Sequence, residues 1–318
     1  MKRFVKIYTY WLLGILLFTG CDDYLKEDSG DLLIPGKVEE FLPMLYREGF
    51  PRNFNDEVAW LYLMTDDVEM GQLELDPEDE ANDTRDKNSS DAFNVGEGEE
   101  PYKWEREIKS YADNFWERRY GNILACNLVI DALPEMEYVE ADSGNYNFLA
   151  AQAYALRAYN YWCLVNSYAL PWSKENLDKP GVIIRMEPQI NISPRGRSSI
   201  REVYDLINED IEKAEKYINI ATFDGNIHRL SEPAILLLAS RIALFQENWD
   251  EVIRTGKLFL AQNSVILNLN DQDTTLFGTE KGLSNKIFTM MDGTINKEVV
   301  FTFGTQSYSP YQYLSTTG

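Results

Sequence analysis

Apolar residues recur at helical spacing along most of the chain, and this pattern predicts an all-α fold. Short helices are expected over Lys37–Arg47 and Asp56–Met70, where the apolar residues share one face. After Tyr102 the helical period returns in two stripes, Trp104-Ile108-Tyr111-Phe115 and Trp116-Tyr120-Ile123-Asn127-Ile130, the second of which ends at Pro134.

The second half of the pattern predicts longer helices. Phe148–Tyr168 is apolar nearly all round, so other helices must cover it on more than one side. Ser199 and Glu202 have the spacing of a capping box, which begins a further helix with an apolar face. The segments Ser231–Phe245 and Asp250–Ala261 are expected to form a helical hairpin.

Two of these helices share the pattern Ala-x-Arg-x-x-x-aromatic, in Ala155–Tyr161 and again in Ala239–Phe245. Small residues followed by a bulky aromatic let helix pairs pack closely, as in tetratricopeptide-type superhelices. Arg157 and Arg241 lie between small residues on nearly all-apolar helices. We therefore expect both to be paired at helix–helix contacts and to touch no ligand. A run of β-branched and aromatic residues that is typical of a β-strand occurs only near the end of the chain, at Val299–Phe303.

The N-terminus has the layout of a secretory signal peptide. Three basic residues within Met1–Lys6 precede a short apolar run, Ile7–Phe18, which is too short to span a bilayer. The run ends at Phe18-Thr19-Gly20-Cys21, which resembles the lipobox of bacterial lipoproteins. The sequence therefore predicts a signal peptide over residues 1–20 and lipidation of Cys21; an ordinary secretory peptide with an incidental cysteine is the alternative.

Charge and composition then exclude whole classes of function. The chain has 30 basic and 52 acidic residues, a net charge of −22, and a surface this negative repels phosphate backbones, so nucleic acid is not an expected partner. The stretch Asp66–Glu100 holds 14 acidic residues against two basic ones. We interpret residues 71–101 as a solvated acidic loop.

Few residues in this chain are suited to catalysis or to metal binding. There is one histidine, His228, in a predicted loop, and Cys126 and Cys163 lie on apolar helices, where buried thiols are favoured over a disulfide. Paired carboxylates cannot be recognised from sequence among 52 acids. A structural calcium is the one metal left open, at 76–80 or 268–273, although neither loop has the glycine of an EF-hand and a plain polar loop is favoured.

Aromatic residues are the surplus, at 13% of the chain, and flat aromatic rings stack on the C–H faces of sugars. The tryptophans at positions 104, 116 and 249 fall at core-like helical positions, which favours a structural role for them. Six residues are candidates for ligand binding, most of them in loops: Phe93, Tyr102, Trp104, Trp172, Tyr308 and Tyr311.

Six short motifs in register resemble the SusD/RagB family: Cys21-Asp22-Asp23-Tyr24-Leu25, Trp116-x-x-x-Tyr120-x-x-Ile123-x-x-Cys126-Asn127-x-x-Ile130, Ala155-x-Arg157-Ala158-Tyr159 continuing to Tyr168, Glu202-Val203-Tyr204, Asn248-Trp249-Asp250 and Glu298-Val299-Val300-Phe301. Members are surface lipoproteins of Bacteroidetes that bind glycans, or occasionally peptides. The resemblance implies a tetratricopeptide-like helical-repeat superhelix with loop insertions and a little β-structure near the C-terminus.

The resemblance also implies a function. We expect a lipid-anchored outer-membrane protein, facing the cell surface, that captures oligosaccharide without catalysis and passes it to a SusC-like TonB-dependent transporter. The alternative is a helical-repeat scaffold lipoprotein that binds a protein or peptide and no sugar. Loop aromatics beside amides favour the first; a smooth concave face without them would favour the second.

Members of the family are usually longer than this chain. We therefore expect a signal peptide at 1–20 followed by a SusD-like helical domain over 21–318 that is incomplete at its C-terminus. Such a superhelix would expose an apolar face that further helices normally cap.

Overall fold

The computed structural model of the protein describes residues 36–51, 64, 100, 103–107, 114–190, 193–266 and 297–302. Within these ranges the chain is helical, with two 3-10 turns and no strand, which confirms the all-α prediction. The helices are α2 (Val38–Glu48), α5 (Phe115–Ala132), η1 (Leu133–Glu135), η2 (Glu140–Asp142), α6 (Ser143–Tyr168), α7 (Ile200–Ile218), α8 (Glu232–Phe245) and α9 (Trp249–Gln262).

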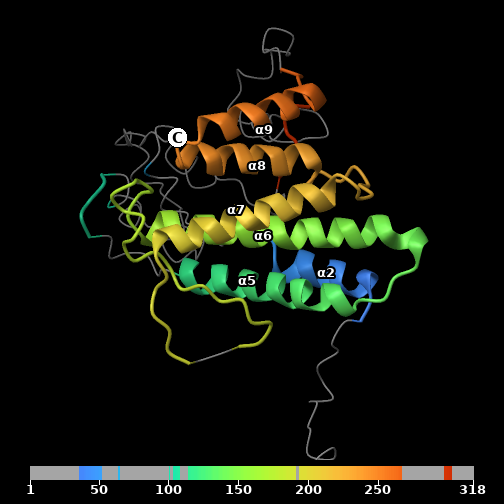
Figure 1. The fold of residues 1–318 in the computed structure, drawn as a ribbon, viewed down its shortest axis with the longest axis horizontal. Coiled ribbons are helices and arrows are strands. Elements are labelled where there is room, and N and C mark those ends of the chain that lie inside the picture. The colour runs from blue at the N-terminus through green and yellow to red at the C-terminus, as the bar shows by residue number, and fades with distance from the viewer. Residues whose placement is uncertain are drawn as a thin grey trace, which may run out of the picture. The chain divides into compact units, whose positions relative to one another are not determined.

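Helix α6 is the centre of the arrangement. It packs most extensively against α7 and α5, while α8 packs against α9 and α2 lies against α5 and α6. Figure 1 shows α5 and α6 running antiparallel, α7 returning beside α6, and the α8–α9 hairpin stacked beyond α7. Successive antiparallel helix pairs of this kind are the building units of a helical-repeat superhelix.

Local sequence sets where these helices begin. Ser199 accepts a hydrogen bond at its hydroxyl from the backbone N–H of Glu202 (3.2 Å), and the Glu202 carboxylate accepts one from the Ser199 N–H (2.7 Å). This confirms the capping box at the start of α7. Ser231 and Asn248 cap α8 and α9 by accepting from the backbone N–H groups of Ala234 and Glu251. Since α8 and α9 also pack against each other, the predicted hairpin is confirmed.

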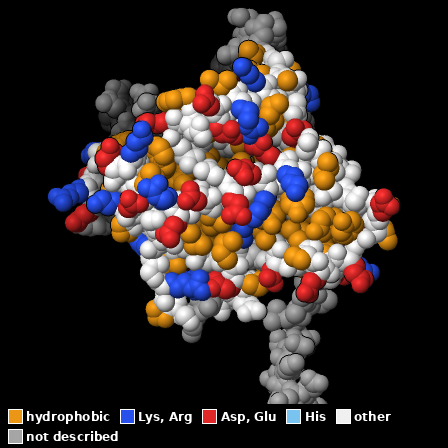
Figure 2. Space-filling view, viewed as in Figure 1, with side chains coloured by type: hydrophobic (Ala, Val, Ile, Leu, Met, Phe, Trp, Pro, Cys, Tyr) orange, Lys and Arg blue, Asp and Glu red, His pale blue; other side chains and the backbone are white. Residues whose placement is uncertain are grey.

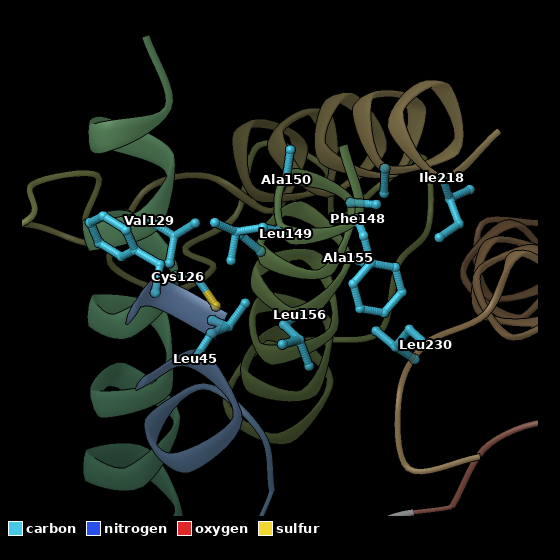
Figure 3. Packing of buried hydrophobic residues seen from close by; sticks show 14 of the residues in the cluster. Leu45, Cys126, Val129, Phe148, Leu149, Ala150, Ala155, Leu156, Ile218 and Leu230 are labelled. Carbon is cyan, nitrogen blue, oxygen red and sulfur yellow. The ribbon is translucent and has the colours of Figure 1, made fainter. Parts of the chain in front are cut away.

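The interior is divided between two clusters of buried side chains. The first, shown in Figure 3, joins α2, α5, α6, the end of α7 and the start of α8, and includes Leu45, Cys126 and Leu149. The second joins the other half of α6 to α5, α7 and α8. Since α6 contributes fourteen buried residues, it is covered on several sides, as its all-round apolar sequence predicts.

Two predicted elements are wrong where the structure describes them. Residues 103–107 form a turn and not the predicted start of a helical stripe, because Trp104 has a left-handed backbone (φ 55°) that a right-handed helix does not contain. Residues 299–302 form no strand. There Phe301 packs on Phe50, and the Thr302 N–H donates to the Ile227 carbonyl at 3.0 Å, so burial replaces sheet pairing.

Burial of two sequence-selected residues also differs from expectation. Arg157 is buried as predicted, but Arg241 is exposed on the outer side of α8. Trp249 begins α9 with 58% of its surface exposed, so it is not a core residue. Helix α9 buries only Thr255 and leaves several large apolar side chains on its outer side, because α8 is the only helix that packs extensively against it among those described.

Several expectations lie outside the described residues: the signal peptide at 1–20, Cys21, the helix over Asp56–Met70, nearly all of the acidic loop and the segment 268–273. Cys126 is buried and Cys163 half-buried, and the two form no disulfide. Across the described ranges, no helix has the length and apolar character needed to cross a membrane.

Candidate functional site

Two of the six predicted ligand-binding residues, Trp104 and Trp172, lie in the described structure; the candidates at 93, 102, 308 and 311 do not. No ring contact joins the two tryptophans within the described part of the chain. They therefore need separate descriptions.

The Trp104 side chain is exposed to solvent. Its side chain is 68% exposed, and its left-handed φ turns the backbone within the segment 103–107. A large aromatic side chain held out on a strained turn gains little from burial, so its position calls for a functional explanation. The sequence placed Trp104 both among the ligand-binding candidates and in a helical core stripe; the exposure favours the first interpretation.

Trp172 has a different environment. It lies in the connection from α6 to α7 (residues 169–199), is half-buried, and packs against the second core cluster. Part of its ring area is therefore used in holding the connection onto the helices. Only the remaining face can meet a ligand.

An aromatic group that the sequence assigned to the core lies where α5 begins and α6 ends. The Trp116 ring lies 4.9 Å from the ring of Tyr168, edge-on at 87°, and 4.9 Å from that of Tyr120. Arg197 places its Cζ 5.8 Å from the Trp116 ring centroid. Its Nη1 donates to the carbonyls of Tyr168 (2.9 Å) and Gly181 (3.3 Å), so the guanidinium joins the end of α6 to the connection.

The segment 182–187 of the connection is held at Val182 by a backbone hydrogen bond from the Ser198 N–H (2.9 Å) and further along by side chains. Tyr120 donates its hydroxyl to the Ile183 carbonyl at 2.6 Å. The Tyr161 hydroxyl donates to the Arg185 carbonyl and accepts from the Arg185 N–H, both at 2.8 Å. Burial raises the pKa of Tyr120 to about 12, and the phenol therefore remains a donor at neutral pH.

A series of buried, hydrogen-bonded polar side chains holds the same segment from the interior. Asn127 donates Nδ2 to the carbonyls of Arg185 (3.0 Å) and Glu187 (3.2 Å), and accepts at Oδ1 from Arg157 Nη1 at 3.0 Å. Arg157 in turn binds Asp210 on α7 through two hydrogen bonds. Burial raises the pKa of the Asp210 carboxyl, and the bonds from Arg157 oppose that rise. Sequence reasoning missed Asn127; its one signal was a polar residue within an apolar stripe.

In a strongly acidic protein, the α6–α7 connection is locally cationic. Arg195 pairs with Glu187, and Arg201 pairs with Asp178 at 3.1 Å. The backbone N–H of Glu187 itself and then Arg195 hold the pKa of this carboxyl below its usual range. These exposed pairs contribute little stability. The guanidinium that lies beside the aromatic group is that of Arg197.

The arrangement offers stacking faces and hydrogen-bond donors, the chemistry that sugar recognition uses. In the described ranges, no group of three or more His, Cys, Asp or Glu side chains is placed to hold a metal ion. His228 is exposed and its Nδ1 lies 3.1 Å from the Thr302 carbonyl.

Comparison with known proteins identifies the family of the chain. Residues 50–244 match a SusD-like family described as starch-binding and associating with the outer membrane. The SusD-like protein P38 of Formosa agariphila is 27% identical over 158 residues, which are 49% of this chain and 27% of that protein.

Solved structures share the fold. A laminarin-binding SusD-like protein superposes with a TM-score of 0.52 at 18% identity, covering 77% of this chain and 48% of that one. A SusD superfamily protein from Bacteroides fragilis gives 0.50 at 20% identity, covering 70% and 48%. The chain thus spans about half the length of these structures. Because the family match covers most of α5 to α8 together with the preceding segment, this chain belongs to the SusD-like family.

Proposed function

We propose that this protein is a cell-surface glycan-binding lipoprotein that captures oligosaccharide and passes it to a TonB-dependent outer-membrane transporter. Membership of a starch-binding, outer-membrane-associated family supports the binding and the location. The observation that carries the proposal is Trp104, a large aromatic side chain that is exposed to solvent on a turn with left-handed backbone.

In this proposal the chain binds and does not catalyse. The C–H face of a sugar ring packs on Trp104, and the exposed face of Trp172 is a second candidate for stacking. The guanidinium of Arg197 donates to sugar hydroxyls with the edge that is not bonded to the two backbone carbonyls. The net charge of −22 disfavours polyanions, so the expected ligand is a neutral oligosaccharide.

The membrane arrangement follows from the same proposal. Acylation of Cys21 anchors the mature protein to the outer membrane, since a lipid anchor needs no spanning helix. The SusC-like transporter is the expected partner for delivery, and the acidic residues Asp22 and Asp23 resemble the surface-export signal of such lipoproteins.

A second function, binding of a protein or peptide, is favoured by one observation. The outer side of α9 exposes Ile253, Leu258 and Leu260, each by more than two fifths of its surface. Exposed apolar side chains of this kind are typical of protein–protein contacts.

Calorimetry with a panel of neutral and uronic-acid oligosaccharides, including a laminarin-derived one, tests the proposal. Trp104→Ala should weaken binding of the neutral ligand by about 5- to 10-fold, because loss of an aromatic stacking partner costs on the order of 1 kcal/mol or more. Trp249→Ala is the matched control, since it removes an equally large, exposed indole from α9. Tight binding of a polyanion, or equal affinity of wild type and Trp104→Ala, would contradict it; binding of peptides alone would favour the second function.

A further inference from the structure

Four tyrosines lie in two ring pairs beside the first core. Tyr138 comes from the loop before η2, Tyr146 and Tyr154 from α6, and Tyr217 from the last turn of α7. The rings of Tyr138 and Tyr146 are stacked with centroids 4.3 Å apart, and those of Tyr154 and Tyr217 lie 5.9 Å apart and within 5° of parallel. We call this group the tyrosine platform.

The two ring pairs are neighbours along α6, because Tyr146 and Tyr154 lie about two turns apart on this helix. Burial, and then the phenols of Tyr217, Tyr138 and Tyr154, raise the pKa of Tyr146. Tyr146, Tyr154 and Tyr217 pack on the first core cluster with their inner sides, whereas Tyr138 is 47% exposed. The platform is therefore a surface layer of aromatic rings on a rigid base and not part of the core.

Polar groups of the platform are left available. Tyr146 donates its hydroxyl to the Leu133 carbonyl at 3.0 Å. Within the described structure, the hydroxyls of Tyr138, Tyr154 and Tyr217 have no hydrogen-bond partner, yet none of them is a buried unsatisfied group. Each can therefore donate to, and accept from, a bound molecule.

A charged pair borders the rings. Lys213 Nζ lies 5.2 Å from the Tyr154 ring centroid and binds Glu209 at 2.6 Å. On the face in view, Figure 2 shows hydrophobic side chains gathered among acidic and basic ones over α5, α6 and α7. Flat rings bordered by donors and acceptors of both charges suit a neutral polyhydroxylated ligand better than an apolar peptide face, which aliphatic residues would serve.

We infer that the tyrosine platform is a second sugar-binding surface for a neutral oligosaccharide, separate from Trp104. This inference rests on the proposed function, since it extends glycan binding to another surface. Tyr146 and Tyr168 are 22 residues apart on α6, about 33 Å along the helix axis, so a short oligosaccharide occupies one surface at a time. A long chain can contact both, which raises its apparent affinity without any new contact.

The test compares a short and a long neutral glycan of the same linkage, chosen from those the wild type binds. Tyr138→Ala and Tyr154→Ala should each lower the stoichiometry for the short ligand from two to one and weaken the long ligand by about 5- to 10-fold, while Trp104→Ala removes the other site. Tyr138→Ala keeps the test sound if Tyr154→Ala fails to fold, because Tyr138 is the exposed member.

Tyr46→Ala is the matched control: Tyr46 is a half-buried tyrosine that packs on the same core but is not part of the platform. If the wild type binds one short ligand and both platform variants bind like Tyr46→Ala, the inference is overturned while the proposed function stands. If the wild type binds no glycan at all, the proposed function fails and the inference fails with it.

Discussion

Arg157 and Asp210 form a buried, two-pronged salt bridge between α6 and α7. Arg157 Nε donates to Asp210 Oδ2 at 2.7 Å and Nη2 donates to Oδ1 at 2.8 Å, and the two side chains are only 2% and 0% exposed. The third donor, Nη1, reaches Asn127 on α5, so one guanidinium joins three helices. Through Asn127 it also holds the backbone of the segment 182–187.

Loss of this pair should be strongly destabilising. Arg157→Met leaves the Asp210 carboxylate buried without its partner, and we expect the free energy of unfolding to fall by about 3–5 kcal/mol. Chemical denaturation measures the change. Arg241→Met is the control, because Arg241 has the same sequence context but is exposed, and its effect should stay within about 0.5 kcal/mol. Equal losses for the two variants would show that burial is not the cause.

The free energy of unfolding should fall at alkaline pH, because buried tyrosine phenols resist losing their protons in the folded protein. Tyr120 has its pKa raised by burial from 10.0 to about 12, so between these values the folded protein keeps a proton that the unfolded chain releases. The contribution of the Tyr120 phenol to the free energy of unfolding is complete below pH 10 and is lost as the pH rises towards 12. Denaturation at pH 8, 10 and 11 should show this decline, on the order of 1–2 kcal/mol after allowance for partial exposure. Tyr120→Phe should reduce the decline by the share of this residue, whereas the other buried tyrosines with raised pKa values keep the rest; an unchanged slope would contradict the assignment.

The two helical cysteines should differ in reactivity. Burial raises the pKa of Cys126 to about 12, and the thiolate is the reactive form, so Cys126 should resist iodoacetamide in the native protein. Cys163 is half-buried and should react first. Mass spectrometry of a Cys21→Ala background, native and in denaturant, measures both sites. Labelling of native Cys126 as fast as Cys163 is the result against this prediction.

Lipidation of Cys21 remains a prediction. Cys21→Ala should release the protein from the membrane fraction, because acylation of this residue is the proposed anchor. Fractionation followed by immunoblotting gives the answer. The experiment needs a strain without the transporter partner, since retention of Cys21→Ala there would show that another feature holds the protein.

Sequence alone determined the helices with strong local signals. The capping box at Ser199 and Glu202, the all-round apolar segment of α6 and the helical hairpin of α8 and α9 lie where the sequence predicts them. Each depends on neighbours within about a turn or on a long uninterrupted period, and such signals are independent of the tertiary environment. The motifs that resemble the SusD/RagB family were likewise sufficient to identify it.

Tertiary structure decided which residues those helices bury. Arg157 and Arg241 share one sequence pattern, yet the first is paired between three helices and the second is exposed, because α6 is covered on several sides whereas the described helices leave the outer side of α8 uncovered. Trp104 fits a helical stripe, but its backbone turns out of it. The tyrosine platform has no sequence period at all, since its four rings meet only when α6, α7 and a loop pack together. Contacts between distant segments depend on packing geometry, which a local pattern does not encode.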